Sequence, residues 1–188
     1  MDQGETVHVM NNCREDERKY RTDKNGLTEE EFLKRYDPGK YPRPSLTADI
    51  LIFRRSGDKI HLLMIRRKGH PYLGYLALPG GFAEAGETLE ETAERELCEE
   101  TGVAGYGLRL VGVYSRPGRD PRGWTVSAAY SAVVDAGRIK AEASDDAESV
   151  QWVPVEKDES GDVRLACDEP LAFDHAEIIS DAISLMLK

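Results

Sequence analysis

Three glutamates on one predicted helix are the residues of this chain best suited to carry chemistry. Glu96, Glu99 and Glu100 are related by steps of one, three and four residues, so on a helix their carboxylates converge. Like charges at this spacing repel one another. A hard divalent cation relieves the repulsion, because Mg²⁺ prefers carboxylate and water oxygens and is often shared with substrate phosphates. This group, called the carboxylate cluster below, therefore predicts a magnesium site that Mn²⁺ could also fill.

The cluster lies within a frame of glycine turn, loop and helix. Residues 88–101 contain neither proline nor glycine, and Gly102 follows where a left-handed C-cap would end a helix. Arg95 can reach back to Glu87 in the preceding loop, where it would orient the loop rather than touch a substrate. The turn before the loop contains Gly80, whose carbonyl could approach a metal closely. A solvated acidic helix face is the alternative interpretation, but such a face needs no frame of this kind.

Arginines outside this frame are candidates for binding phosphate. Arg67 ends a predicted strand, and its guanidinium could fork onto phosphate oxygens. Residues 115–123 form a basic loop between two predicted strands, and loops of this kind often carry specificity. A solvated charge and a plain hairpin connection are the respective alternatives, and for Arg116 in this loop the two interpretations weigh about equally. We predict that Arg67, Arg119 and Arg122 bind substrate.

The residues favour hydrolysis by a metal-activated water over nucleophilic catalysis by a side chain. No Ser-His-Asp or Cys-His arrangement stands out, and His70 and His175 are expected to be structural. A bound cation would lower the pKa of a water that attacks a phosphorus of a diphosphate bridge. The general base stays open between Glu100 and the acidic loop 144–148, which holds Asp145, Asp146 and Glu148. The predicted catalytic residues are Glu87, Arg95, Glu99, Glu100 and Asp146, and the predicted metal ligands are Gly80, Glu96, Glu99 and Glu100.

Composition narrows the class of protein and its surroundings. With 188 residues and 40% hydrophobic content, the chain can form one domain with a sizeable core. A net charge of −10 argues against a general nucleic-acid surface, which needs basic patches. The three cysteines lack metal-ligand spacing and are typical of reduced thiols. No signal peptide or membrane-length apolar run is recognisable, so we expect a cytoplasmic protein that does not enter the membrane.

The order of predicted elements indicates the fold. Residues 1–40 are interpreted as an N-terminal arm and a short helix, which starts with a capping box of Thr28 and Glu31. Residues 41–188 form the main domain. Its β-branched and aromatic runs predict strands at 46–54, 60–66, 76–78, 108–114, 124–134 and 150–153, and a last helix follows Asp174. Strands around one helix, closed by another, predict a mixed α/β (α+β) fold in which helices cover both faces of a mixed sheet, an α/β/α sandwich.

Residues 81–103 match the pattern G-x5-E-x7-R-E-U-x-E-E-x-G-U, with U aliphatic, at every constrained position. This pattern is the Nudix box, and the chain therefore resembles the Nudix hydrolase superfamily. Further motifs resemble its ADP-ribose pyrophosphatase branch, at residues 70–74, 78–82, 119–123, 145–147 and 171–175. The resemblance implies Mg²⁺-dependent hydrolysis of a nucleoside diphosphate derivative, with ADP-ribose cleaved to AMP and ribose 5-phosphate. It also implies a homodimer in which the N-terminal segment of one subunit helps to cover the site of the other.

Two alternatives follow from the same resemblance. Residues 30–38 and the outlying motifs are also similar to Nudix-related transcriptional regulators of NAD metabolism, which bind ADP-ribose as a signal, commonly with a degraded box and a C-terminal winged helix. Here the box is intact and we expect no DNA-binding domain, so a working hydrolase is favoured over a sensing module. Another substrate is the second alternative: NADH, a different nucleoside diphosphate sugar or an oxidised nucleoside triphosphate. A base-stacking aromatic would decide among these, and the candidates are Tyr41, Tyr72, Tyr114 and Trp124.

Overall fold

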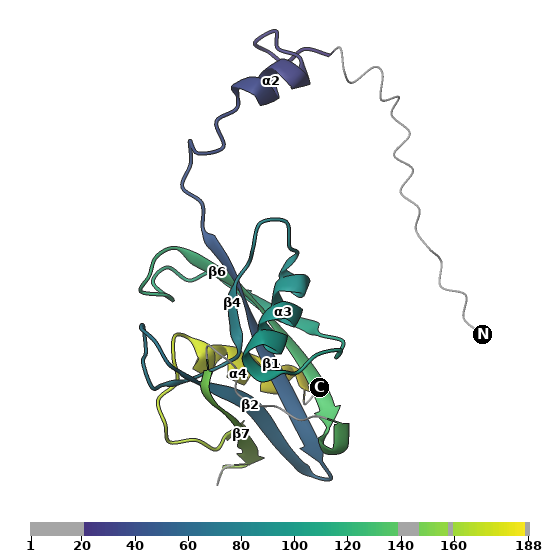
Figure 1. The fold of residues 1–188 in the computed structure, drawn as a ribbon, viewed down its shortest axis with the longest axis vertical. Coiled ribbons are helices and arrows are strands. Elements are labelled where there is room, and N and C mark those ends of the chain that lie inside the picture. The colour runs from purple at the N-terminus through teal and green to yellow at the C-terminus, as the bar shows by residue number, and fades with distance from the viewer. Residues whose placement is uncertain (1–20, 139–146, 158–159, 187–188) are drawn as a thin grey trace, which may run out of the picture. The chain divides into compact units, whose positions relative to one another are not determined.

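The computed structural model describes residues 21–138, 147–157 and 160–186, and it divides into two units, Met1–Pro42 and Arg43–Lys188. In the first unit, α2 (Glu29–Arg35) begins after Thr28, which forms the predicted capping box with Glu31. The second unit contains the other elements of the described residues (Figure 1). The division lies two residues beyond the predicted boundary at residue 40.

The second unit is built on one mixed sheet with the strand order β5-β6-β1-β2-β7-β8. The pair of β1 and β6 is parallel, and the other pairs are antiparallel. The strands are β1 (Ser45–Ser56), β2 (Lys59–Arg67), β5 (Arg109–Tyr114), β6 (Thr125–Asp135), β7 (Ala147–Lys157) and β8 (Val163–Leu165), with a 3-10 helix η1 (Ala136–Arg138) after β6. The predicted strands are present, and β8 and a short strand at residues 80–82 are additions to them.

The two central strands diverge and create a fork. At one end β1 pairs directly with β2, from Phe53 to Ser56. At the other end β1 pairs with β4 (Gly80–Phe82), while β2 pairs with β3 (Leu76–Ala77). The turn between β3 and β4 therefore lies between the separated ends of β1 and β2. Residues 78–80, called the β3–β4 turn below, include the predicted metal ligand Gly80.

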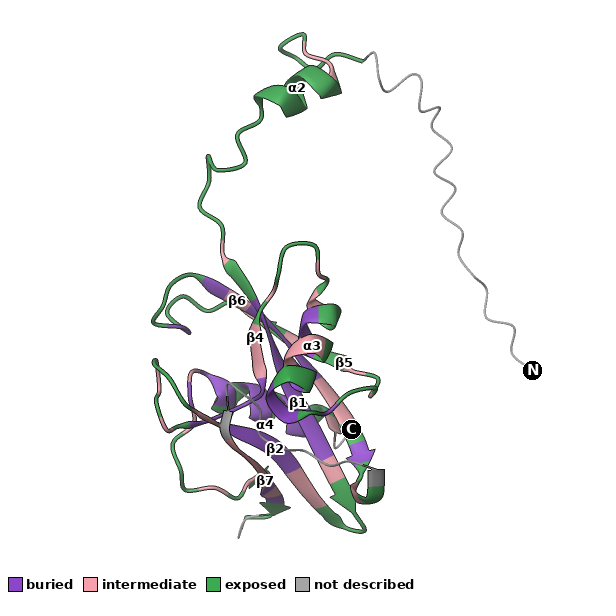
Figure 2. Cartoon of the chain, in the orientation of Figure 1, coloured by how far each residue is buried: buried purple, intermediate pink, exposed green. Residues whose placement is uncertain are grey.

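Helices cover both faces of the sheet, because successive residues of a strand point to opposite sides. One buried cluster joins β1 to α3 (Leu89–Thr101) and includes Ala48, Ile50, Ile52, Ala93 and Leu97. The other joins β1 and β2 to α4 (His175–Met186) and includes Leu51, Phe53, Leu62, Ile178 and Ile183. Figure 2 shows the buried stretches of the central strands between these helices. The predicted α/β/α sandwich with a mixed sheet is confirmed.

Helix α3 begins and ends where the sequence predicts. Thr88 is its N-cap and forms a capping box with Glu91, so the first backbone N–H groups have side-chain partners. Gly102 ends the helix in the left-handed conformation, with φ of 68°. Within the described residues, no helix combines the length and apolar character needed to cross a membrane.

Candidate active site

Arg95 ties the carboxylate cluster to the loop before it. Its Nε lies 2.7 Å from Glu87 Oε1, which confirms the predicted contact between these residues. Its Nη1 donates to Glu96 at 2.8 Å and to Glu99 at 3.1 Å, and its Nη2 donates to the carbonyl of Phe82 at 3.0 Å. One guanidinium thus holds the loop, the end of β4 and two members of the cluster together.

Glu87 acts as the anchor of this loop. Hydrogen bonds from Arg95, from the N–H of Glu84 and from Thr92 lower the pKa of its carboxyl group to about 2. The same ion pairs, with Glu87 first and Glu96 next, raise the pKa of the Arg95 guanidinium above its ordinary value. Both groups are therefore charged at neutral pH, and the loop stays closed against α3.

Glu100 is the buried member of the cluster and contacts the β3–β4 turn. Its Oε2 accepts a hydrogen bond from the N–H of Gly80 at 2.8 Å. Gly80 has φ of +152°, and a Cβ at this position would collide with the carbonyl of Ala48. A Cβ on Gly81 would collide with the carboxylate of Glu96. Glycine at position 80 therefore lets the turn lie against β1, and glycine at position 81 lets β4 approach the cluster.

The carboxylate cluster offers the donors of a metal site but is arranged around Arg95. Across residues 21–138, 147–157 and 160–186, no three His, Cys, Asp or Glu side chains are grouped as metal ligands. The sequence interpretation that a cation relieves the repulsion was incomplete, because Arg95 already pairs with Glu96 and Glu99. The chemistry of the set nevertheless fits a hard divalent cation, since carboxylates and a glycine turn supply only oxygen ligands.

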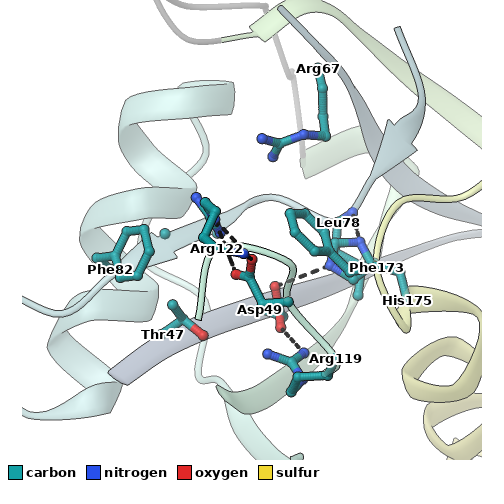
Figure 3. Close-up of a pocket in the computed structure, with 12 residues that line it drawn as sticks. Thr47, Asp49, Arg67, Leu78, Phe82, Arg119, Arg122, Phe173 and His175 are labelled. Carbon is teal, nitrogen blue, oxygen red and sulfur yellow. Dashed lines mark hydrogen bonds and ion pairs between the residues drawn. The ribbon is translucent and has the colours of Figure 1, made fainter. Parts of the chain in front are cut away.

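A cavity opens beside the β3–β4 turn and brings the three predicted substrate-binding arginines together (Figure 3). Its walls come from β1, β4, the basic loop, the end of β2 and the start of α4. Its cationic, aromatic and imidazole side chains are Arg67, Phe82, Arg119, Arg122, Phe173 and His175. Because Gly80 and Gly81 also line the cavity, it adjoins the carboxylate cluster.

Arg67 and Arg122 both lie against aromatic rings at this cavity. The guanidinium of Arg67 is 5.0 Å from the ring centre of Phe173, and that of Arg122 is 5.4 Å from it and 4.7 Å from the ring of Phe82. Burial and the nearby charge of Arg122 lower the pKa of Arg67. Asp120 orients Arg122 through a contact of 2.7 Å with its Nη2. The guanidinium groups of Arg67 and Arg122 each stack on aromatic rings and repel each other. An anion between them is therefore favoured.

Arg119 has a different environment from the other two arginines. Its side chain is 5% exposed, and its Nε and Nη2 donate to Asp174 at 2.8 and 2.7 Å. Its Nη2 also lies 3.5 Å from Asp49. Arg119 lies in the cavity wall, but two buried carboxylates attract the donors that were expected to meet phosphate. Asp174, predicted to start the last helix, thus uses its carboxylate to hold the basic loop.

Asp49 is the centre of a buried polar network that the sequence interpretation missed. Its Oδ2 accepts from Ser127 Oγ at 2.5 Å, and its Oδ1 lies 3.4 Å from His175 Nε2. Burial alone would raise the pKa of Asp49, but His175, Ser127 and Arg119 together hold it below its ordinary value. A single carboxylate within the apolar run 46–53 was the available signal, because buried acids are almost always paired.

The remaining candidates lie outside the described residues, at the surface or beside a residue of the cavity wall. Asp145 and Asp146 lie outside the described residues, as does the side chain of Glu148. Arg116 pairs at the surface with Glu177 at 3.0 Å. Of the proposed aromatics, Tyr72 contacts Phe173 with ring centres 4.8 Å apart, Tyr114 donates to Asp181, and Tyr41 and Trp124 are exposed. The aromatics that line the cavity are Phe82 and Phe173. The sequence interpretation did not single out either ring, although they lie within the motifs at residues 78–82 and 171–175.

Comparison with known proteins identifies the family. The sequence pattern of the NUDIX domain matches residues 43–165. The chain is 39% identical over 153 residues to an ADP-ribose pyrophosphatase from Methanocaldococcus jannaschii, covering 80% of this chain and 81% of that protein. It is 33% identical over 162 residues to an ADPR responsive transcriptional repressor from Acinetobacter baylyi, covering 85% of this chain and 61% of the repressor. This protein therefore belongs to the Nudix family and is a Nudix hydrolase, a class of enzymes that generally uses divalent metal ions.

Solved structures agree with this assignment. A MutT/nudix family protein from Enterococcus faecalis superposes with a TM-score of 0.77 at 31% identity, covering 93% of this chain and 75% of that one. The NUDIX domain of Shewanella oneidensis NrtR, crystallised with ADP ribose, gives a TM-score of 0.73 at 31% identity, covering 85% of this chain and 99% of that one. Both structures therefore share the fold and the family of this chain.

Proposed function

We propose that this enzyme hydrolyses the diphosphate bond of ADP-ribose to give AMP and ribose 5-phosphate. The observation that carries the proposal is the contact of Glu100 with Gly80, which puts the carboxylate cluster against a cavity lined by Arg67 and Arg122. A diphosphate needs both features, a site for a hard cation and cationic donors for its oxygens. The pyrophosphatase from Methanocaldococcus jannaschii and the ADP ribose complex of NrtR support ADP-ribose as the first substrate to test.

The cavity arginines would bind the diphosphate. Stacking on Phe173 and the bond to Asp120 orient Arg122, and a guanidinium has more N–H donors than one carboxylate can accept. Arg67 would meet the same anion from the end of β2. Glu96, Glu99, Glu100 and the carbonyl of Gly80 would hold Mg²⁺, or Mn²⁺ in its place. When bound, this ion lowers the pKa of a water and offsets charge on the leaving phosphate.

The reaction requires one water and one proton acceptor. The water oxygen bonds to a phosphorus, the bridging P–O bond breaks, and the proton of the water passes to a carboxylate. Glu100 and Asp146 are the candidates for that base. Glu87 and Arg95 keep the loop against α3 and so maintain the position of the cluster.

The direct test is incubation of the purified protein with ADP-ribose and Mg²⁺, followed by chromatography for AMP. A panel of NADH, other nucleoside diphosphate sugars and oxidised nucleoside triphosphates is assayed in parallel. We expect the highest kcat/KM with ADP-ribose. Turnover of another panel member without turnover of ADP-ribose would make that member the substrate. No turnover of any member would contradict the proposal.

Glu100→Gln tests the role of the cluster. The amide oxygen of glutamine can still accept the N–H of Gly80, but the negative charge is lost. We expect kcat to fall by at least about a hundredfold, as for the loss of a metal ligand, with little change in Tm. Glu94→Gln, on an exposed part of the same helix, is the matched control. Full turnover of the Glu100 variant would remove this residue from the mechanism.

Sensing of ADP-ribose without turnover is the second candidate, favoured by the similarity to the Acinetobacter baylyi repressor. Titration calorimetry with ADP-ribose, combined with the AMP assay, separates the two functions. Binding with no AMP formed in the presence of Mg²⁺ or Mn²⁺ would favour the sensor. The complete box, with Glu96, Glu99 and Glu100 all present, supports the hydrolase.

The family resemblance also supports a homodimer, and the net charge of −10 supports a protein that does not bind nucleic acid. Light scattering behind a sizing column should give twice the chain mass of 21.0 kDa. A single-chain mass would contradict the dimer.

A further inference from the structure

The β3–β4 turn is held by three different elements. Its backbone bonds run from Leu78 N–H to His175 Nδ1 at 2.9 Å, from Ile50 N–H to the carbonyl of Pro79 at 2.9 Å, and from Gly80 N–H to Glu100 Oε2 at 2.8 Å. Helix α4, strand β1 and helix α3 thus each hold one residue of the turn. The bond from Leu78 is the one that the start of α4 supplies, and α4 lies on the opposite face of the sheet from the carboxylate cluster.

The bonding partners of His175 determine which nitrogen carries its proton. Nδ1 accepts the N–H of Leu78, so a neutral ring has its hydrogen on Nε2. Nε2 faces Asp49 Oδ1 at 3.4 Å, and Asp49 is itself held by Ser127. The residue is 3% exposed, so water does not replace either partner. Asp49 therefore orients the ring, and the ring orients Leu78 (Figure 3).

A displacement at Leu78 is passed directly to the active site. Only Pro79 separates Leu78 from Gly80, and proline fixes its own φ. Gly80 pairs with Asp49 of β1, and a Cβ built on it would collide with the carbonyl of Ala48, so its backbone lies close against β1. A shift of the turn would therefore change the distance between Gly80 and Glu100.

We propose that His175 is a positioning residue. Through Leu78 it sets the β3–β4 turn so that Gly80 meets Glu100, and Asp49 keeps its ring in the required tautomer. Its effect on turnover rests on the proposed function, whereas its effect on the turn does not. The polar partners of this buried histidine are Leu78 and Asp49, so it acts on the carboxylate cluster through the turn.

A pair of substitutions separates the two contacts of His175. In His175→Asn, the side-chain oxygen lies where Nδ1 was and can accept from Leu78, but the side chain is too short for Asp49. In His175→Gln, the terminal amide reaches toward Asp49 and leaves the N–H of Leu78 without this acceptor. His175→Ala removes both contacts. A position error of the turn lowers kcat, so we expect losses between about tenfold and a hundredfold in the Ala and Gln variants. The Asn variant should stay within about fivefold of the natural enzyme.

Tyr114→Phe is the matched control for a general loosening of α4. The hydroxyl of Tyr114 donates to Asp181 at 3.0 Å and so joins β5 to the same helix without touching the turn. This variant should keep its kcat even where its Tm falls. A kcat that follows Tm across all four variants would reduce His175 to a structural residue and overturn the proposal.

Amide hydrogen exchange measured by NMR, without metal or substrate, gives a readout independent of activity. The amides of Leu78 and Gly80 should exchange at least about tenfold faster in the Ala and Gln variants than in the Asn and Tyr114→Phe variants. Equal exchange in the Asn and Gln variants would overturn the proposal. If the natural enzyme hydrolyses no member of the nucleotide panel, the proposed function fails, and the exchange comparison still decides whether His175 sets the turn.

Discussion

Two arginines of this protein face carboxylates on opposite sides of the β3–β4 turn, and they differ in almost every other respect. The carboxylate partners of Arg95 lie within eight residues of it, and its side chain is 23% exposed. The partners of Arg119 lie 55 and 70 residues away, and its side chain is 5% exposed. Arg95 and its carboxylates, called the first group below, include the predicted metal ligands Glu96 and Glu99. Arg119, Asp49 and Asp174, called the second group, support the wall of the cavity.

The contrast shows how charge serves two purposes in one site. Arg95 pairs with Glu96 and Glu99, which would have to exchange this partner for a cation, and partial exposure lets water assist such an exchange. Arg119 is paired with Asp174 where water has little access, so losing either partner leaves a buried charge uncompensated. The carboxylates around Arg95 can therefore exchange their partner, whereas those around Arg119 keep theirs. The β3–β4 turn connects the two groups.

Arg119→Ala should have the largest effect and tests the second group. It leaves Asp49 and Asp174 buried without their cation, which costs about 3–5 kcal/mol of folding free energy. A protein of this size should then lose about 10 °C in Tm, measured by calorimetry. Arg116→Ala, in the same loop with an exposed partner, is the control and should change the stability by less than about 1 kcal/mol. Equal Tm values for the two variants would show that the buried group does not support the fold.

Arg122→Ala should have an intermediate effect, mainly on binding. Its side chain is 41% exposed but its partner Asp120 is buried, so Tm should fall by less than in Arg119→Ala. If it binds the diphosphate uniformly, KM for ADP-ribose rises by about tenfold with a smaller change in kcat. Arg122→Lys keeps the charge but loses the planar stack on Phe82, and it should recover only part of the affinity. Unchanged kinetics in both variants would make this side of the cavity a mere connection.

The smallest effect concerns the pH dependence of the first group. The pKa of Glu87 is lowered from 4.5 to about 2, chiefly by Arg95. A lowered pKa in the folded state adds stability above about pH 4.5, and this contribution is lost as the pH falls toward about 2. In Arg95→Gln, an NMR titration of the Glu87 carboxyl carbon should show a pKa closer to 4.5. An unchanged value would mean that Arg95 does not hold the loop.

Much of the first group could be predicted because its contacts are local. The spacing of Glu96, Glu99 and Glu100, the reach of Arg95 to Glu87 and the end of α3 at Gly102 all depend on helical geometry within a few residues. Runs of β-branched and aromatic residues likewise predicted the central strands, and the order of the elements predicted helices on both faces of the sheet. These features follow from the period of each element.

The second group could not be predicted in the same way. Asp49 and His175 are brought together by the fork of β1 and β2 and by the packing of α4, neither of which is a property of any single segment. Arg119 shows the difference most clearly. Its place in a basic loop could be predicted from the sequence, but its partners could not.

The amino-acid sequence by itself determined the family pattern, the helix of the carboxylate cluster and the kind of sheet, because periodicity and capping act over short distances. Only the tertiary structure decided that the turn at Gly80 is held from three sides, and that of the three arginines at the cavity Arg119 is the one paired with two buried carboxylates. The physical reason is that strand pairing and burial depend on the whole chain, and burial determines which charges must find a partner.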